Sequence, residues 1–177
     1  GERQSAALLA MTLESMGAHA VSLAGWQAGM YTDDEYGDAK LQLIFPSRAA
    51  AALKAGFIPV VTGFQGVNAR GDVSTLGRGG SDTSAVAIAA AMHADLCQIF
   101  TDVDGVYTAD PAKDPTAVKY DTISYDDVLA QHLMVMDSTA TSLSMDNHIP
   151  VLLFALKDPH NIIRALMGEN VGTIVGE

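Results

Sequence analysis

The chain has 177 residues, of which 49% are hydrophobic and 18% are charged, and this balance excludes an intrinsically disordered protein. Its net charge of -11 would repel nucleic acid and anionic membranes, so neither is expected as a partner. The longest apolar runs, 85–92 and 149–156, are far shorter than the roughly 18 residues that a membrane-spanning helix requires.

Hydrophobic spacing and turn residues predict alternating helices and strands along the whole chain. In chain order the predicted elements are helix 3–16, strand 19–24, loop 25–37, helix 47–54, strand 57–62, hairpin 63–76, glycine loop 77–80, helix 83–93, strand 96–101, hairpin-like segment 102–111, helices 124–131 and 138–147, strand 151–156, helix 161–167 and strand 172–175. Ser47 is expected to cap the second helix, and Ser81 or Asp82 the third. The apolar face of the first helix is expected at Ala7, Leu8, Met11 and Met16.

This alternation predicts an α/β fold, a three-layer α-β-α sandwich around a mainly parallel central sheet. No internal repeat, low-complexity tract or linker interrupts the pattern, so a single domain over 1–177 is expected. The only cysteine, Cys97, excludes an internal disulfide and favours a reducing cytoplasm. Its position in a predicted strand is typical of a small buried apolar residue.

The strongest chemical signal is the glycine loop TLGRGGSD at 75–82, which opens a helix. Glycines let the backbone approach an anion closely, and the start of a helix favours negative charge. Arg78 adds a forked cation that suits a carboxylate or a phosphate. The loop is not a Walker A motif, because no lysine follows the glycines. A tight turn from strand to helix is the simpler alternative for these residues.

Two further segments follow predicted strands, at the edge where open α/β sheets bind ligands. In TDVDGVYTADP at 101–111, Tyr107 could flank a base, and Asp102 and Asp110 could accept hydrogen bonds from ribose or amino groups. A solvated Asp-Gly hairpin is the alternative there. For GFQG at 63–66 the alternative is a turn with a packed aromatic side chain, and for Glu2 it is an exposed, frayed terminus.

A metal site held by the protein is not expected, because the five histidines are scattered and neither HExxH nor CxxC spacing occurs. The acids at 33–35 are typical of a solvated loop rather than of a metal cage. A GxSxG nucleophile elbow is also missing from the sequence.

Together these segments resemble the amino-acid kinase family, and up to about residue 110 they look like aspartokinase. The matching stretches are GE at 1–2, GWQAG at 25–29, GFQG at 63–66, TLGRGGSD at 75–82 and TDVDGVYTADP at 101–111. From about Asp114 onward the chain looks like bacterial uridylate (UMP) kinase. The stretches there are DPTA at 114–117, VMDSTA at 135–140, DN at 146–147 and LMGEN at 166–170. The whole therefore reads as a mosaic, an engineered chimera or an unusual natural relative.

The resemblance implies an amino-acid kinase (carbamate kinase-like) fold, with an acceptor part over 1–95 and a nucleotide part over 96–177. It implies direct phosphoryl transfer from Mg-ATP, with magnesium held mainly through the phosphates. The implied acceptor-binding residues are Glu2, Phe64, Arg78 and Ser81, with Arg78 also the catalytic cation that pairs with the substrate carboxylate. The implied nucleotide-binding residues are Gly79, Gly80, Thr101, Asp102, Tyr107 and Asp110.

Three departures from the aspartokinase pattern concern cations. The family's opening strand and its lysine- and glycine-containing loop are missing, so an N-terminally truncated domain is expected, and the start at Gly1 without Met indicates an excerpt or a processed product. Met134 stands near the position of a second expected lysine, and Ala112 stands where many aspartokinases have arginine.

Three functions follow as hypotheses. The first is an aspartate kinase, which makes aspartyl phosphate and is expected to be of doubtful activity in this truncated form. The second is a UMP kinase, and the third is a folded scaffold without catalysis. The expected partners are ATP and aspartate, with UMP as second choice. The sheet edge left by a missing strand also predicts a homo-oligomer.

Overall fold

The computed structural model describes residues 1–133 and 136–177, which form two compact units, Gly1–Met92 and His93–Glu177. Each unit has its own cluster of buried apolar side chains. Among the described residues, no helix combines the length and the apolar character that crossing a membrane demands.

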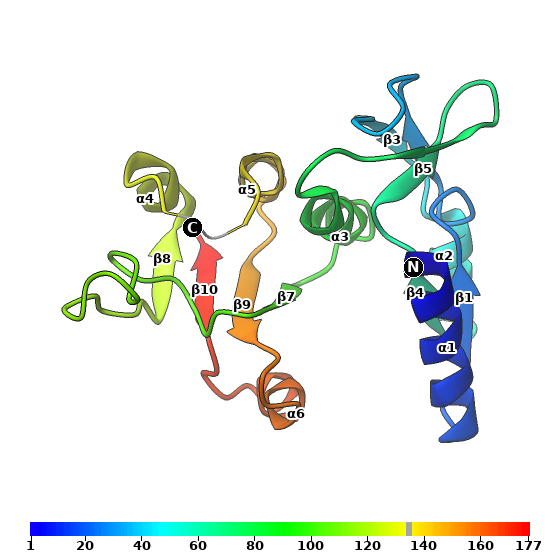
Figure 1. Ribbon diagram of the computed structural model, residues 1–177. Coiled ribbons are helices and arrows are strands. Elements are labelled where there is room, and N and C mark those ends of the chain that lie inside the picture. Colours follow the sequence, from blue (N-terminus) through cyan, green and yellow to red (C-terminus); the bar gives the residue numbers. More distant parts are fainter. Residues whose placement is uncertain (134–135) are drawn as a thin grey trace. The chain divides into compact units, whose positions relative to one another are not determined.

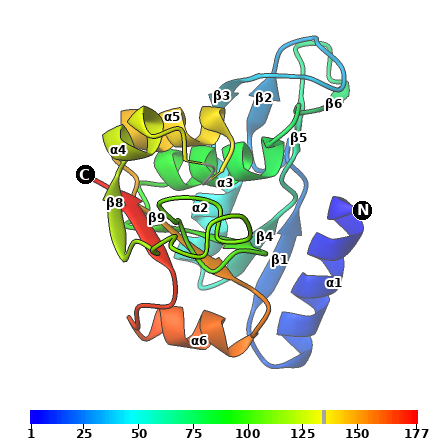
Figure 2. The same cartoon turned by 60° about the vertical axis from the view of Figure 1, so that its left-hand side comes forward.

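The first unit is built from helices and short strands. In chain order its elements are α1 (Glu2–Ser15), β1 (Ala20–Leu23), β2 (Met30–Thr32), β3 (Leu41–Ile44), α2 (Ser47–Lys54), β4 (Ile58–Val61), β5 (Gln65–Val67), β6 (Val73–Thr75) and α3 (Gly80–Ala91). Strands β1 and β4 pair in parallel, and Figure 2 shows α1 on one side of this pair and α2 on the other. Leu23 of β1 and Ala49 of α2 are buried together in the core of this layer.

Helix α1 forms where it is expected, but the face predicted to be buried is wrong. Leu8, Met11 and Met16 are 62%, 67% and 77% exposed, whereas Ala6 and Ala10 are buried. These two alanines lie one turn apart, and small side chains there let α1 approach β1 and β4 closely. The face of α1 with the larger apolar side chains is therefore not the face that packs against the strands.

A second sheet in this unit has the strand order β3-β2-β5-β6. Strands β5 and β6 are antiparallel and confirm the hairpin predicted over 63–76. The loop predicted over 25–37 is wrong in part, because it contains β2, which pairs with β3 and with β5. The buried hydroxyls of Thr32 and Ser74 lie 2.5 Å apart and link β2 to β6. Strands this short are too brief to show an alternating pattern in the sequence.

Neither predicted serine cap is present. Pro46 is the residue that precedes α2, and Ser47 is already helical and makes no capping hydrogen bond. Gly79 precedes α3 in the left-handed conformation, with φ of 75°, while Ser81 and Asp82 lie inside the first turn. A left-handed residue at this position favours glycine. Helix α3 therefore begins before the two residues that were predicted to cap it.

The second unit contains a four-stranded sheet with helices. Its elements are β7 (Cys97–Thr101), β8 (Thr122–Ser124), α4 (Tyr125–Ala130), α5 (Ser138–Asp146), β9 (Val151–Ala155), α6 (His160–Leu166) and β10 (Thr173–Gly176). Figure 1 shows the strands side by side in the order β7-β9-β10-β8. All five residues of β9 are buried, so both faces of this strand are covered. Leu152 and Phe154 pack against Ala165 of α6.

The segment 102–111 does not form the predicted hairpin with itself. Tyr107 instead forms an antiparallel bridge with Lys119, and the flanking backbone groups bond across the same ladder, with Tyr120 N–H donating to the carbonyl of Val106 over 2.9 Å. The Asp-Gly pair at 104–105 indicated a local turn, but the strand-like partner lies farther along the chain. This places the loop at the carboxyl end of β7, where it can line a crevice.

The α/β class and the mainly parallel pairing are confirmed. The β1–β4, β7–β9, β8–β10 and β2–β5 pairings are parallel. The described strands are distributed over three sheets, and β8 was not expected from the sequence.

Candidate functional site

The glycine loop of the first unit is shaped by close packing around the start of α3. Gly79 adopts a left-handed conformation, which glycine reaches without steric cost. A Cβ atom on Gly80 would lie 2.5 Å from Cβ of Leu76 and 2.9 Å from the ring of Phe64, so only glycine fits there. The N-terminus of α3 is thereby brought close to Phe64. Helix N-termini carry N–H groups that suit an anion.

Ser84 joins the glycine loop to the GFQG turn. Phe64 has an unusual positive φ of 66°, and its backbone N–H donates to Oγ of Ser84 over 3.1 Å. The Ser84 hydroxyl in turn donates to the carbonyl of Ser81 over 2.9 Å. Ser84 is only 2% exposed. Ser84 thus joins two segments that are separate in the sequence. A serine in the interior of a helix carries no signal of such a contact by itself.

Replacing Ser84 with alanine is expected to lower the free energy of unfolding by about 1–3 kcal/mol, because the partly buried N–H group of Phe64 loses its acceptor. Urea unfolding followed by circular dichroism measures this change. The exposed Ser15, whose hydroxyl bonds only to Thr12 within α1, provides a control that should change by no more than about 0.5 kcal/mol. Equal effects of the two alanine variants would contradict this role for Ser84.

The other residues of the first unit that were predicted to bind the acceptor substrate are exposed. Glu2 begins α1 and lines a cavity of about 390 Å³ together with Thr62 and Gly63, which follow β4. Arg78 is exposed and forms no ion pair or hydrogen bond with any described residue, so its guanidinium is available to a ligand. Ser81 is also exposed, in the first turn of α3. Phe64 and Ser81 are joined through Ser84, and Gly80 packs against the Phe64 ring. Among the described residues, no hydrogen bond or ion pair joins Arg78 to Glu2.

The GWQAG stretch at 25–29 contributes an aromatic ring, that of Trp26, which contacts the start of α1. The guanidinium carbon of Arg3 lies 4.9 Å from the centroid of the Trp26 ring, a cation–π distance. This contact fixes the first turn of α1, and hence the helix that carries Glu2. The frayed terminus considered for Glu2 is therefore not what the structure has, since the helix begins at Glu2 itself.

The second unit holds the largest cavity described, of about 960 Å³, at the carboxyl ends of the parallel strands β7 and β9. Three of the residues predicted to bind a nucleotide, Asp102, Tyr107 and Asp110, line it. Thr101 is not among the lining residues, but its hydroxyl donates to Oδ1 of Asp102 over 3.1 Å and orients that carboxylate. Ala155 closes the cavity from β9.

Hydrogen bonds reinforce the ordinary protonation states of two lining groups in this cavity. The Tyr107 hydroxyl donates to Asp104 over 2.9 Å, and this bond raises the pKa of Tyr107. Lys113 lies 3.1 Å from Oδ2 of Asp110, and the backbone N–H of Ala112 donates to Oδ1 of the same carboxylate. The bond from Lys113, followed by that from Ala112, lowers the pKa of Asp110. At neutral pH Tyr107 is therefore a neutral donor and Asp110 a charged acceptor.

The described residues offer no metal cage. No group of three histidine, cysteine, aspartate or glutamate side chains among them is arranged to hold an ion. The acids at 33–35 instead organise their own loop, since Asp33 accepts hydrogen bonds from the backbone N–H groups of Glu35 and Lys40, and Asp34 pairs with Arg70. Met134, which stands near the position of an expected lysine, lies outside the described residues.

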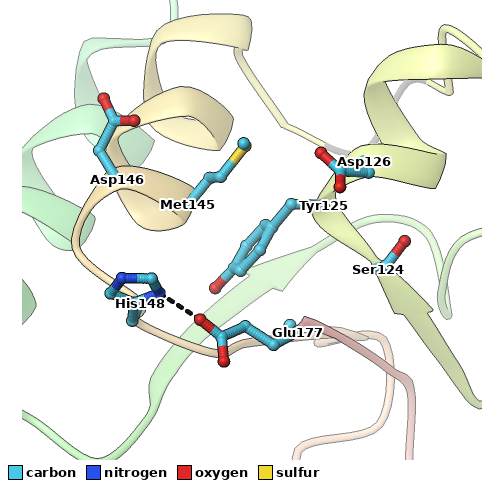
Figure 3. A pocket seen from close by; sticks show the side chains of 8 residues that line it. Ser124, Tyr125, Asp126, Met145, Asp146, His148 and Glu177 are labelled. Atoms are coloured by element: carbon cyan, nitrogen blue, oxygen red, sulfur yellow. Dashed lines mark ion pairs between the residues drawn. The ribbon is translucent and has the colours of Figure 1, made fainter.

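Figure 3 shows another cavity of the second unit, of about 550 Å³, which none of the predicted site residues lines. The Tyr125 side chain points into it, and its hydroxyl donates to the carbonyl of Ile149. Burial raises the pKa of Tyr125, so this phenol stays protonated at neutral pH. His148 and Glu177 form an ion pair at the edge of the cavity. These contacts are typical of a structural network that stabilises the sheet.

The sequence model of the amino acid kinase family matches residues 1–163. The chain is 54% identical to the aspartokinase of Corynebacterium efficiens and 44% identical to that of Corynebacterium glutamicum, each over 175 residues. These alignments cover 96% of this chain and 42% of each relative, so the chain spans less than half the length of the curated relatives it matches.

Solved structures share the fold over both units. The structure of E. coli aspartokinase III in complex with aspartate and ADP matches with a TM-score of 0.81 at 29% identity, covering 100% of this chain and 39% of that one. The UMP kinase of Bacillus anthracis matches with a TM-score of 0.74 at 25% identity, covering 97% of this chain and 64% of that one. Both kinds of protein named in the sequence resemblance therefore share this fold.

Proposed function

Because the chain belongs to the amino acid kinase family, we propose that it forms part of an ATP-dependent aspartate kinase, which phosphorylates the side-chain carboxylate of aspartate. The observation that carries this proposal is the 960 Å³ cavity, which three of the predicted nucleotide residues line at the carboxyl ends of β7 and β9. Its support from relatives is the identity of 44% and 54% to two aspartokinases, and the likeness to an aspartokinase that binds aspartate and ADP.

In this proposal one unit binds the acceptor and the other binds the nucleotide. Gly1–Met92 supplies the acceptor side, with Glu2, Phe64, Arg78 and Ser81 around the aspartate. His93–Glu177 supplies the nucleotide side. Asp102 and Asp110 accept hydrogen bonds from ribose or amino groups there, and the Tyr107 ring flanks the base. The glycine backbone at 79–80 stays a predicted phosphate contact, since the start of α3 favours an anion.

The reaction is a direct transfer. A carboxylate oxygen of aspartate attacks the γ-phosphorus of ATP, the bond from that phosphorus to the oxygen shared with the β-phosphate breaks, and ADP leaves with the electron pair. Arg78 holds the carboxylate of aspartate through its planar fork of donors. The chain's own contribution is positioning and charge stabilisation, with no covalent intermediate on the protein.

In this proposal magnesium enters with the nucleotide. It would be held through phosphate oxygens and at most one or two carboxylates. When bound, the ion neutralises charge that develops on the phosphates.

Isothermal titration of the chain tests the proposed function. Mg-ATP is titrated alone, with aspartate, and separately with UMP. We expect aspartate to tighten the binding of Mg-ATP and UMP to leave it unchanged. Tightening by UMP instead would favour the second hypothesis, which is motivated by the likeness of 114–177 to UMP kinase and by the shared fold. Absence of heat with every ligand, from a chain shown to be folded by circular dichroism, would favour a scaffold.

Assembly, origin and location are further parts of the proposal. A homo-oligomer stays a prediction, as does the mosaic of two families. Placement in the cytoplasm is supported by the presence of a single cysteine, Cys97, buried in β7.

A further inference from the structure

The nucleotide cavity of the second unit has an unfavourable charge for a triphosphate. Asp102, Asp104 and Asp110 all line it, and the chain as a whole carries a net charge of -11. Like charges placed this close repel one another unless cations offset them. A site for the phosphate chain of ATP therefore requires a positive group that is not already neutralised.

Few cations of the second unit are available. Between His93 and Glu177 the sequence has four lysines or arginines, Lys113, Lys119, Lys157 and Arg164. Lys113 lines the cavity but is paired with Asp110 at 3.1 Å, and Arg164 is paired with Glu169 at 2.7 Å. Lys119 does not line the cavity, and its stem lies beside Gly105.

Lys157 is the cation that remains. It lies in the turn that follows β9 at the carboxyl end of the sheet, it lines the cavity, and it is exposed. Its ammonium group forms no ion pair or hydrogen bond with any residue in the described ranges 1–133 and 136–177. We propose that Lys157 is the phosphate-contacting cation of this cavity and binds the phosphate chain of a nucleoside triphosphate. This inference rests on the proposed function and assigns one residue of its nucleotide site.

The chemistry of lysine suits this role. An ammonium group is a compact charge with three donors on a flexible stem, so it can follow phosphate oxygens without a fixed geometry. Ligands in open α/β sheets bind beyond the carboxyl ends of the strands, which is where Lys157 stands. Paired Lys113 serves the loop instead, since its contact with Asp110 keeps that carboxylate charged.

Calorimetric titration with two ligands tests the inference. Mg-ATP and adenosine are titrated into the unchanged chain and into Lys157→Met, Lys157→Arg and Lys40→Met. Lys40 is an exposed, unpaired lysine of the first unit, so its replacement removes the same charge elsewhere. We expect Lys157→Met to weaken Mg-ATP binding about tenfold or more, because a hydrogen bond to a charged group is lost, and to leave adenosine binding within about twofold. Lys157→Arg should retain most of the affinity, and Lys40→Met all of it.

The outcomes separate this inference from the proposed function. Unchanged Mg-ATP affinity in Lys157→Met, or an equal loss of affinity for adenosine, would overturn the role of Lys157 while the proposed function stands. A folded, unchanged chain that binds neither ligand would overturn the proposed function and the role of Lys157 with it.

Discussion

Replacing Arg78 with alanine is expected to weaken aspartate binding, measured in the presence of Mg-ATP, by about 10- to 100-fold. A charge-assisted hydrogen bond is worth about 1.5–3 kcal/mol, and a fork of two such bonds lies at the upper end. Arg78 is exposed and makes no ion pair among the described residues, so its removal should change the free energy of unfolding by less than about 0.5 kcal/mol. The loss is thus expected in ligand affinity alone.

The matched control for this prediction is Arg48→Ala. Arg48 is an exposed arginine in the first turn of α2, and its replacement removes the same charge away from the glycine loop. Isothermal titration with aspartate should leave this variant unchanged, and Arg78→Lys should be intermediate, because lysine cannot form the planar fork. Equal affinities for the Arg78 and Arg48 alanine variants would show that Arg78 does not contact the acceptor.

Replacing Phe154 with alanine is expected to lower the free energy of unfolding of the second unit by about 3–5 kcal/mol. Phe154 is 0% exposed, in a strand whose five residues are all buried. Its ring packs against Leu152 and Ala165 and lies 4.8 Å from the ring of Phe100. Removing it leaves a cavity between β9 and α6 that neighbouring side chains fill only in part. Urea unfolding followed by circular dichroism measures the change.

Phe45→Ala is the chemically matched control for this core substitution. Phe45 is 59% exposed beside Tyr31, so the same change should cost no more than about 1 kcal/mol. Loss of stability in Phe154→Ala should also weaken Mg-ATP binding, since β9 ends at the cavity that we propose binds the nucleotide. A Phe154 variant with unchanged stability would contradict the assignment of this strand as the core of the unit.

Local signals were enough to predict most elements and the candidate residues. The hairpin over 63–76 is indicated by an interrupted strand pattern with a Gly-Asp turn, and the glycine loop by glycines ahead of an apolar helix. The loop 102–111 was predicted at the end of a strand, and the structure places it around the largest described cavity. Each of these features depends on residues a few positions apart, which is the range that pattern reasoning covers.

Contacts between distant residues decided the rest. The short strand β2 forms because β3 and β5 pair with it. Helix α1 buries alanines because small side chains let it pack closely on β1 and β4. Ser84 matters because Phe64, twenty residues earlier, presents a backbone N–H to it. Lys157 stands out only because Lys113 and Arg164 have partners and Lys119 does not line the cavity.

The sequence by itself therefore determined the family, the alternation of helices and strands, and the motifs that could meet a nucleotide and a carboxylate. Only the tertiary structure decided which helix face is buried, which serine holds the glycine loop, and which lysine is left unpaired in a cavity. The physical reason is that propensity and spacing act within a turn or a strand, whereas burial and charge pairing depend on what the rest of the chain brings alongside.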